Sequence, residues 1–151
     1  TPSRSSAASD VYKRQLETYG VPVIVYGQDM MPAFWSSTSD IPAPLRTDSP
    51  GEIAAGLRAR KALGINGGQL IANPVPKQEE ISAEIIGPLI EMALHEASHQ
   101  KITAKAVTPF LLGRIFELTK GKSLTTNIAL VKNNAQLAAE IAKSCYKLAN
   151  I

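Results

Sequence analysis

Cysteine is almost absent from this sequence, and long apolar runs are absent altogether. The single cysteine, Cys145, excludes a disulfide framework and an all-cysteine metal site. It fits a reducing compartment, most simply as a small buried hydrophobe. No apolar run approaches the length of a membrane span, so we expect a soluble, cytoplasmic protein without a membrane partner.

Several motifs of phosphate and acyl chemistry are also missing. There is no Gly-x-Ser-x-Gly elbow and no internal repeat, and the glycine-rich turn at residues 64–68 lacks the Lys and Ser/Thr of a phosphate loop. The net charge of +3 arises from 16 basic and 13 acidic residues, and three cations against Asp10 within residues 1–15 account for most of it. The remainder is near neutral, so we expect no nucleic-acid partner.

What is present indicates a globular α/β protein. The 151 residues are 44% hydrophobic and 19% charged, enough for one domain with its own core. The apolar run Val21–Tyr26 predicts a buried strand, and Gln69–Ala72 predicts a second. Between them, Ser49-Pro50-Gly51-Glu52 forms a capping box that opens a helix ending near Leu63. This order predicts a parallel-sheet βαβ core with flanking helices. Asn73 follows the second strand, where such sheets bind ligands, although Asn before Pro also forms turns.

The segment from Gly27 to Asp48 has no periodicity and is long for a loop in a compact domain. It contains several large apolar side chains, so we expect it to pack rather than move freely. Two interpretations stay open: a loop that seals a core or a subunit interface, and a lid over a ligand.

Ser82 predicts the start of a helix that runs to about Gln100. It carries His95 and His99 at the i, i+4 spacing that can chelate a metal. The intervening residues are Glu-Ala-Ser and no third ligand is evident nearby. We therefore favour two solvent-facing histidines over a metal site.

The C-terminal third predicts two helices joined at Gly121-Lys122. For the first, we expect Thr108 as N-cap with Pro109 at the first helical position. The second is expected to begin at Ser123, with an apolar stripe facing a core. The stripe consists of Leu124, Ile128, Val131, Ala135, Ala138, Ala142, Cys145 and Leu148. Asn127 and Asn134, close to that stripe, indicate either a buried hydrogen-bond network or a surface that reads a polar ligand.

Several motifs in one order carry a family resemblance. They are LETYGVPVIVYG, PLRTDSPGEIA, GGQLIANPVP, KAVTPFLL and SLTTNIALVKNNAQLAAEIA. Together they resemble the pseudouridine-5'-phosphate glycosidases, the family that includes the indigoidine synthase A-like proteins. The match runs from about Leu16 to the C-terminus and covers only the second half of such an enzyme. It implies that residues 16–151 are the C-terminal half of a larger α/β/α domain. Residues 1–15 are then a tail, a targeting peptide or, as we favour, a sequence join.

The resemblance implies a lyase that reversibly converts pseudouridine 5'-phosphate to uracil and ribose 5-phosphate, a pseudouridylate synthase classified among the carbon–oxygen hydro-lyases. It further implies a lysine that forms a Schiff base with the sugar, a glutamate for proton transfer, an aspartate-held Mn2+ and a homotrimer. In the family these catalytic residues precede the LETYG segment. Lys13 lacks the residues that surround the Schiff-base lysine in the family, and no sequence feature marks Lys105 or Lys132 as the nucleophile. We therefore expect the chain by itself to be inactive and to hold no metal ligands.

The resemblance implies that one part of the family's site lies in this chain: an amide cluster that recognises the base, at Asn127, Asn133 and Asn134. An amide offers both a donor and an acceptor to the uracil edge. We favour Asn127 for this role, with Thr108 as a further residue bordering the site. The alternative is that these amides only tie the last helix to the missing part of the sheet. Two other functions stay open: a non-catalytic module that binds a nucleotide or a partner through the Gly27–Asp48 loop, and an indigoidine-cluster relative with a different substrate.

Overall fold

The structure is a computed structural model that describes residues 14–149. Residues 1–13, which hold Lys13 and nearly all of the segment that lacks the family pattern, lie outside the described residues. At the centre is a parallel sheet of three strands in the order β2-β1-β3. The strands are β1 (Val23–Tyr26), β2 (Leu45–Thr47) and β3 (Leu70–Ala72). The predicted α/β fold with a parallel sheet and flanking helices is confirmed.

The middle strand and the following helix form as the sequence predicts. Val23 and Val25 of β1 are 2% and 0% exposed. Helix α2 (Pro50–Ala62) begins at the expected N-cap, where the Ser49 hydroxyl accepts a hydrogen bond from the Glu52 backbone N–H. It ends at Leu63, followed by Gly64 with φ of +69°, the left-handed conformation that favours glycine. Helix α2 thus links β2 to β3 across β1.

Strand β2 corrects the interpretation of residues 27–48 as one long loop. Its three residues pair with Ile24, Val25 and Tyr26 of β1. A strand this short shows no readable alternation, since only Thr47 is buried while Leu45 and Arg46 are exposed. The true loop is residues 27–44, which folds back on itself through an isolated antiparallel bridge between Met30 and Pro42.

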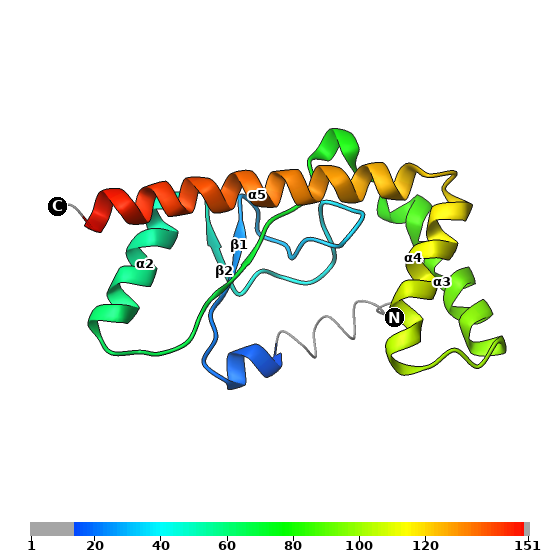
Figure 1. The fold of residues 1–151 in the computed structure, drawn as a ribbon, viewed down its shortest axis with the longest axis horizontal. Coiled ribbons are helices and arrows are strands. Elements are labelled where there is room, and N and C mark those ends of the chain that lie inside the picture. The colour runs from blue at the N-terminus through cyan, green and yellow to red at the C-terminus, as the bar shows by residue number, and fades with distance from the viewer. Residues whose placement is uncertain (1–13, 150–151) are drawn as a thin grey trace.

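The remaining elements are helical. They are η1 (Lys77–Glu79), α3 (Ala83–His99), η2 (Ala104–Ala106), α4 (Val107–Leu118) and α5 (Lys122–Ala149). Helix α5 runs the length of the molecule (Figure 1), with α2 near its C-terminal end, the sheet at its middle, and α3 and α4 beside its N-terminal end. None of the described helices combines the length and the apolarity that a bilayer crossing demands.

The main hydrophobic cluster lies where α3 and α4 meet the loop. Ile81, Ile86, Ala93 and Ile115 are its buried members, and Trp35 of the 27–44 loop packs against them. Ser36 is 4% exposed and its hydroxyl donates to the backbone oxygen of Ile81 at 2.8 Å. The prediction that this loop packs rather than moves freely is therefore confirmed.

The boundary of α4 differs from the prediction. Thr108 is not an N-cap, because the short helix η2 leads directly into α4 and Ala106 takes the cap position. At the other end, the backbone N–H groups of Lys120 and Gly121 donate to the carbonyls of Glu117 and Phe116. This is a Schellman motif, and both residues have positive φ, +51° for Lys120 and +86° for Gly121.

The apolar stripe predicted to face the core of α5 was placed on the wrong side. The buried residues of this helix are instead Ser123, Thr126, Leu130 and Leu137. Leu124, Ile128 and Val131 are 49%, 47% and 59% exposed. Two members of this face are polar: Ser123 lies at the helix start and Thr126 donates to the backbone oxygen of Glu79, so polarity along α5 did not mark which side packs.

Candidate ligand-binding site

The three parallel strands all end at one edge of the sheet. Strand β1 ends at Tyr26, β2 at Thr47 and β3 at Ala72, and the residues that follow are Gly27, Asp48 and Asn73. Open parallel sheets bind ligands at this carboxyl edge, because the loops that leave the strands meet there. The edge is therefore the candidate site.

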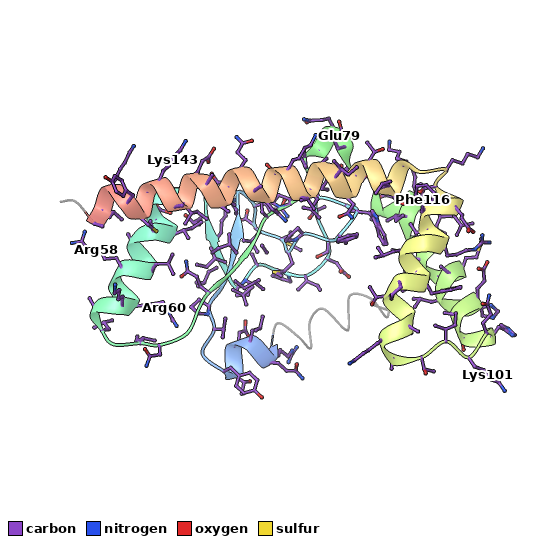
Figure 2. All side chains as sticks on the ribbon, in the orientation of Figure 1. Arg58, Arg60, Glu79, Lys101, Phe116 and Lys143 are labelled. Carbon is purple, nitrogen blue, oxygen red and sulfur yellow. The ribbon has the colours of Figure 1, made fainter. Side chains whose placement is uncertain are left out.

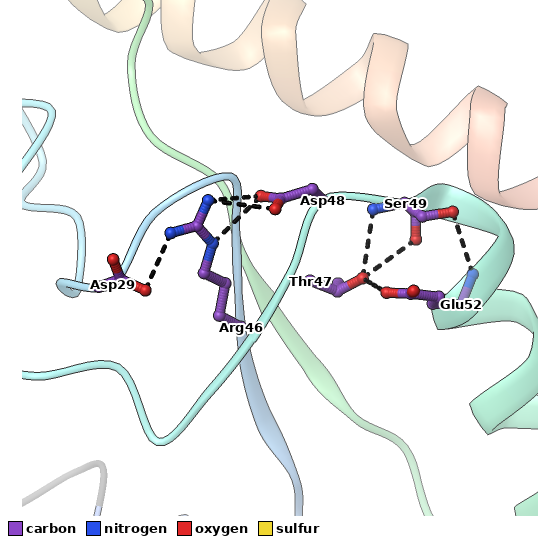
Figure 3. Close-up of polar contacts among 6 residues, drawn as sticks. All are labelled: Asp29, Arg46, Thr47, Asp48, Ser49 and Glu52. Atoms are coloured by element: carbon purple, nitrogen blue, oxygen red, sulfur yellow. Dashed lines mark hydrogen bonds and ion pairs between the residues drawn. The ribbon is translucent and has the colours of Figure 1, made fainter.

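Thr47 organises the exit from β2 into α2 (Figure 3). Its side chain is almost fully buried, and its hydroxyl contacts the Glu52 carboxylate in a short hydrogen bond. The same hydroxyl accepts from the Ser49 backbone N–H at 3.2 Å. In a simple capping box Glu52 would reach the N-cap backbone itself. Here Thr47 stands between the two, so the first turn of α2 is fixed to the end of the strand.

Arg46 joins the ends of β1 and β2. Its guanidinium lies 2.9 Å from a carboxylate oxygen of Asp29 and 3.0 Å from one of Asp48 (Figure 3). The hydrogen bonds that Arg46 donates to Asp29 and then to Asp48 raise its pKa. Both carboxylates are exposed, so the three groups set the loop position more than they add stability.

Two asparagines of α5 reach the exit of β3. The Asn133 side-chain amide donates to the backbone oxygen of Pro74 at 2.9 Å. The Asn73 amide donates to the side-chain oxygen of Asn134 at 3.1 Å. Asn133 and Asn134 are thus brought to the carboxyl edge of the sheet, together with Asn73, and each keeps one end of its amide free of these contacts.

Thr126 fixes the first turns of α5 to the same segment. It is fully buried, and its hydroxyl donates to the backbone oxygen of Glu79 at 2.7 Å. Figure 2 shows Glu79 in η1 beside α5. Asn127 follows immediately, half-buried, and no hydrogen bond joins its amide to another group within residues 14–149. Asn127 therefore lies between the contacts at Thr126 and Asn133 with its donor and acceptor both available.

Thr108 lies apart from these asparagines. It is exposed in the first turn of α4. Ten further residues of that helix, about 15 Å of rise, separate it from the end of α4 at Leu118. Within the described chain, Asn133 and Asn134 contact the exit of β3, Asn127 lies about two turns before them on α5, and Thr108 lies elsewhere.

The 27–44 loop contributes a hollow beside the sheet rather than at its edge. The hollow has a volume of about 560 Å³ and lies between the loop and the start of α3. The loop is anchored below it, where the Glu80 carboxylate accepts from the Ser37 backbone N–H at 2.8 Å. Hydrogen bonds from the side chain and the backbone of Ser37 lower the pKa of Glu80.

Residues 14–149 contain no group of three His, Cys, Asp or Glu side chains placed to hold a metal. His95 and His99 are exposed and stack edge to face with ring centroids 4.5 Å apart. Asp29 and Asp48 face Arg46. The described residues do not fit a Mn2+ centre.

Sequence reasoning found the asparagines of α5 but missed Arg46, Thr47 and Thr126. A signal for Thr47 did exist, since it directly precedes a capping box and so had to lie where a strand meets a helix. Thr126 gave no signal, because a threonine inside a helix is ordinary and its partner is a backbone oxygen distant in sequence.

These features define an α/β protein with a polar carboxyl edge closed by a long C-terminal helix. The chain belongs to the family of indigoidine synthase A like proteins, whose model matches residues 11–144.

Relatives and solved structures agree with this membership. A pseudouridine-5'-phosphate glycosidase from Paracoccus denitrificans is 61% identical over 127 residues, which are 84% of this chain and 42% of that protein. One from Geobacillus kaustophilus is 58% identical over 128 residues, 85% of this chain and 42% of that protein. The chain therefore spans less than half the length of these relatives.

Two solved structures share the fold. The prealnumycin C-glycosynthase AlnA, solved in complex with ribulose 5-phosphate, superposes with a TM-score of 0.82 at 25% identity, over 93% of this chain and 46% of that one. An indigoidine synthase A-like protein from Thermotoga maritima superposes with a TM-score of 0.73 at 32% identity, over 85% of this chain and 42% of that one.

Proposed function

We propose that this chain supplies the base-recognising part of a pseudouridine-5'-phosphate glycosidase. The reaction is the reversible cleavage of the carbon–carbon glycosidic bond to uracil and ribose 5-phosphate. The identity of 61% to a protein of that name supports this. So does the likeness to a C-glycosynthase in complex with a sugar phosphate, since both names describe chemistry at a carbon–glycosyl bond.

The observation that carries the proposal is the available amide of Asn127. It is half-buried between two anchored positions of α5, and no hydrogen bond within residues 14–149 engages its donor or acceptor. Uracil presents adjacent N–H and C=O groups, and one amide can pair with both. Asn133 and Asn134 take a supporting role in this proposal, because their amides already hold the exit of β3.

The covalent step belongs to residues outside this chain. A carbon leaving group cannot be released by protonating an oxygen, so the proposed enzyme uses a lysine amine that forms a Schiff base with the sugar. Lys105 and Lys132 are exposed, and we propose neither as the nucleophile. The lysine, a proton-transferring glutamate, the Mn2+ site and the homotrimer are therefore proposed for the complete enzyme, a lyase by its chemistry.

A chimera tests the function. The 127 matched residues of this chain replace their counterparts in the P. denitrificans relative, and uracil release from pseudouridine 5'-phosphate is measured with Mn2+. We expect activity. The Asn127→Ala chimera should lose about 10- to 100-fold in kcat/KM, the range for removing hydrogen bonds to a bound polar group. Asn66→Ala, an exposed asparagine outside the site, is the matched control.

The outcomes separate the alternatives. A folded chimera without activity would refute the glycosidase proposal and favour a non-catalytic module that binds through the hollow beside the 27–44 loop. Equal activity of the Asn127→Ala and Asn66→Ala chimeras would be compatible with the glycosidase function but would refute the role of Asn127 in recognising the base. Activity only on a different C-glycosyl substrate would favour an indigoidine-cluster relative with a different substrate.

A further inference from the structure

Helix α5 carries a second apolar face, which is exposed within the described chain. Its members, here called the α5 seam, are Leu124, Ile128, Val131, Ala135, Ala138 and Ala142, and all six are exposed. At about 100° per residue they lie within about 80° of one another around the helix axis. Their centre is about 140° from that of the buried residues Thr126, Leu130 and Leu137. The seam therefore faces away from these buried residues.

The spacing along the seam alternates strictly between four and three residues. From Leu124 to Ala138 the spacing averages about 3.5 residues, the period of a helix that packs against another helix with knobs in holes. The three alanines at one end would let a second helix approach closely. The seam therefore indicates a helical partner rather than a sheet or a small ligand.

The size of the seam makes exposure to water costly. It extends for about 27 Å along α5, and its three large side chains are 47% to 59% exposed. Scattered exposed apolar residues are normal on a protein surface, but a continuous stripe of this kind marks an interaction surface.

The charges beside the seam specify the partner further. Lys132 is exposed and borders the seam near its middle. Glu140 is the one acidic residue of α5, and it lies on the far side, where it accepts from Gln136 at 3.3 Å. In a symmetric antiparallel pair of α5 helices, the two Lys132 side chains would come together with no carboxylate to offset them. A second copy of this chain is thus disfavoured, and a helix with a carboxylate opposite Lys132 is favoured.

We propose that the α5 seam is the docking surface for an acidic amphipathic helix from the part of the family protein that this chain does not span. More than half of the AlnA chain lies outside the region that superposes on this structure, and the same holds for the P. denitrificans relative. That length of chain can provide such a helix. The proposal depends on family membership and not on the proposed activity.

Co-expression tests the proposal. The whole 151-residue chain is produced with an affinity-tagged part of the P. denitrificans relative, the part outside its 127 matched residues, and the amount that co-purifies is measured. Val131→Lys should lower co-purification by at least about tenfold, because it places a charge in an apolar seam. Ile85→Lys is the matched control, since Ile85 of α3 is 61% exposed against 59% for Val131. Its effect should stay within about twofold.

Two further measurements exclude unfolding of the variants and identify the segment that docks on the seam. Circular dichroism should show both variants to be as helical as the natural chain, so that lost co-purification reflects lost docking. A photo-crosslinking amino acid at position 131 should attach to a helical peptide of the relative that carries Asp or Glu. Three results would overturn the proposal: no co-purification of the natural chain, equal loss for Val131→Lys and Ile85→Lys, or cross-links to a second copy of the chain.

Discussion

Replacing Thr126 by Val tests how α5 is held beside the sheet. Valine keeps nearly the same shape in a helix but cannot donate a hydrogen bond. The Thr126 hydroxyl is fully buried and donates to the backbone oxygen of Glu79 at 2.7 Å. The substitution therefore leaves that carbonyl without its partner and places a methyl group against it.

The expected cost follows from the surroundings of the carbonyl. Leaving a buried polar group unpaired costs about 1–3 kcal/mol. Glu79 is half-buried, so water can partly replace the lost donor, and the lower part of that range applies, about 1–2 kcal/mol. For a domain of this size we expect the melting temperature to fall by about 3–6 °C.

The matched control is the next residue toward the N-terminus. Thr125→Val makes the same chemical change in the same helical turn, but Thr125 is exposed, so its effect should stay within about 0.5 kcal/mol. Urea unfolding followed by circular dichroism measures both variants. If the two unfold at the same urea concentration, the contact between Thr126 and Glu79 does not stabilise the fold and the reasoning fails.

Two further predictions concern stability. A hydrogen-bonded network from Ser37 lowers the pKa of Glu80, so the stabilising contribution of the carboxylate is present above its ordinary pKa of about 4.3 and is lost as the pH falls below it. Between neutral pH and pH of about 3.5, the Glu80→Gln chain should consequently lose less unfolding free energy than the natural chain, as urea unfolding at both pH values would reveal. If both chains lose the same amount, the Glu80 carboxylate does not contribute this stability. Lys120→Gly should raise the unfolding free energy by about 0.5–1 kcal/mol, because Lys120 has a φ of +51° that glycine adopts without strain. Lys122→Gly, at a helical position, is its control and should lower it.

The parts of the fold that were predictable are those coded by neighbours in sequence. The strand at Val23–Tyr26 and the cap at Ser49 were predicted within a residue or two, because a buried apolar run and a capping box are complete local signals. The same reasoning failed at Thr108. A Thr-Pro pair is a sound N-cap signal, yet the preceding residues already turn into a 3-10 helix and move the start of α4 to Val107.

The candidate site was only partly predictable. Residue type alone singled out the asparagines of α5, because an amide in a helix next to apolar residues needs a partner. Which amide is engaged was decided by distant backbone, since Pro74 lies 59 positions from the Asn133 that donates to it. The cluster around Arg46 and Thr47 depends on the pairing of β2 with β1. A strand of three residues is too short to show a sequence pattern that predicts this pairing.

By itself, the sequence determined the α/β class, the positions of most helices and the family resemblance, because hydrophobic period, caps and motifs are properties of short stretches. Only the tertiary structure decided which side of α5 is buried. Both of its faces have helical spacing, and the choice depends on where Glu79 and Pro74 present their carbonyl oxygens. A buried backbone acceptor must be paired, so the face that carries Thr126 and Asn133 beside Leu130 and Leu137 packs inward.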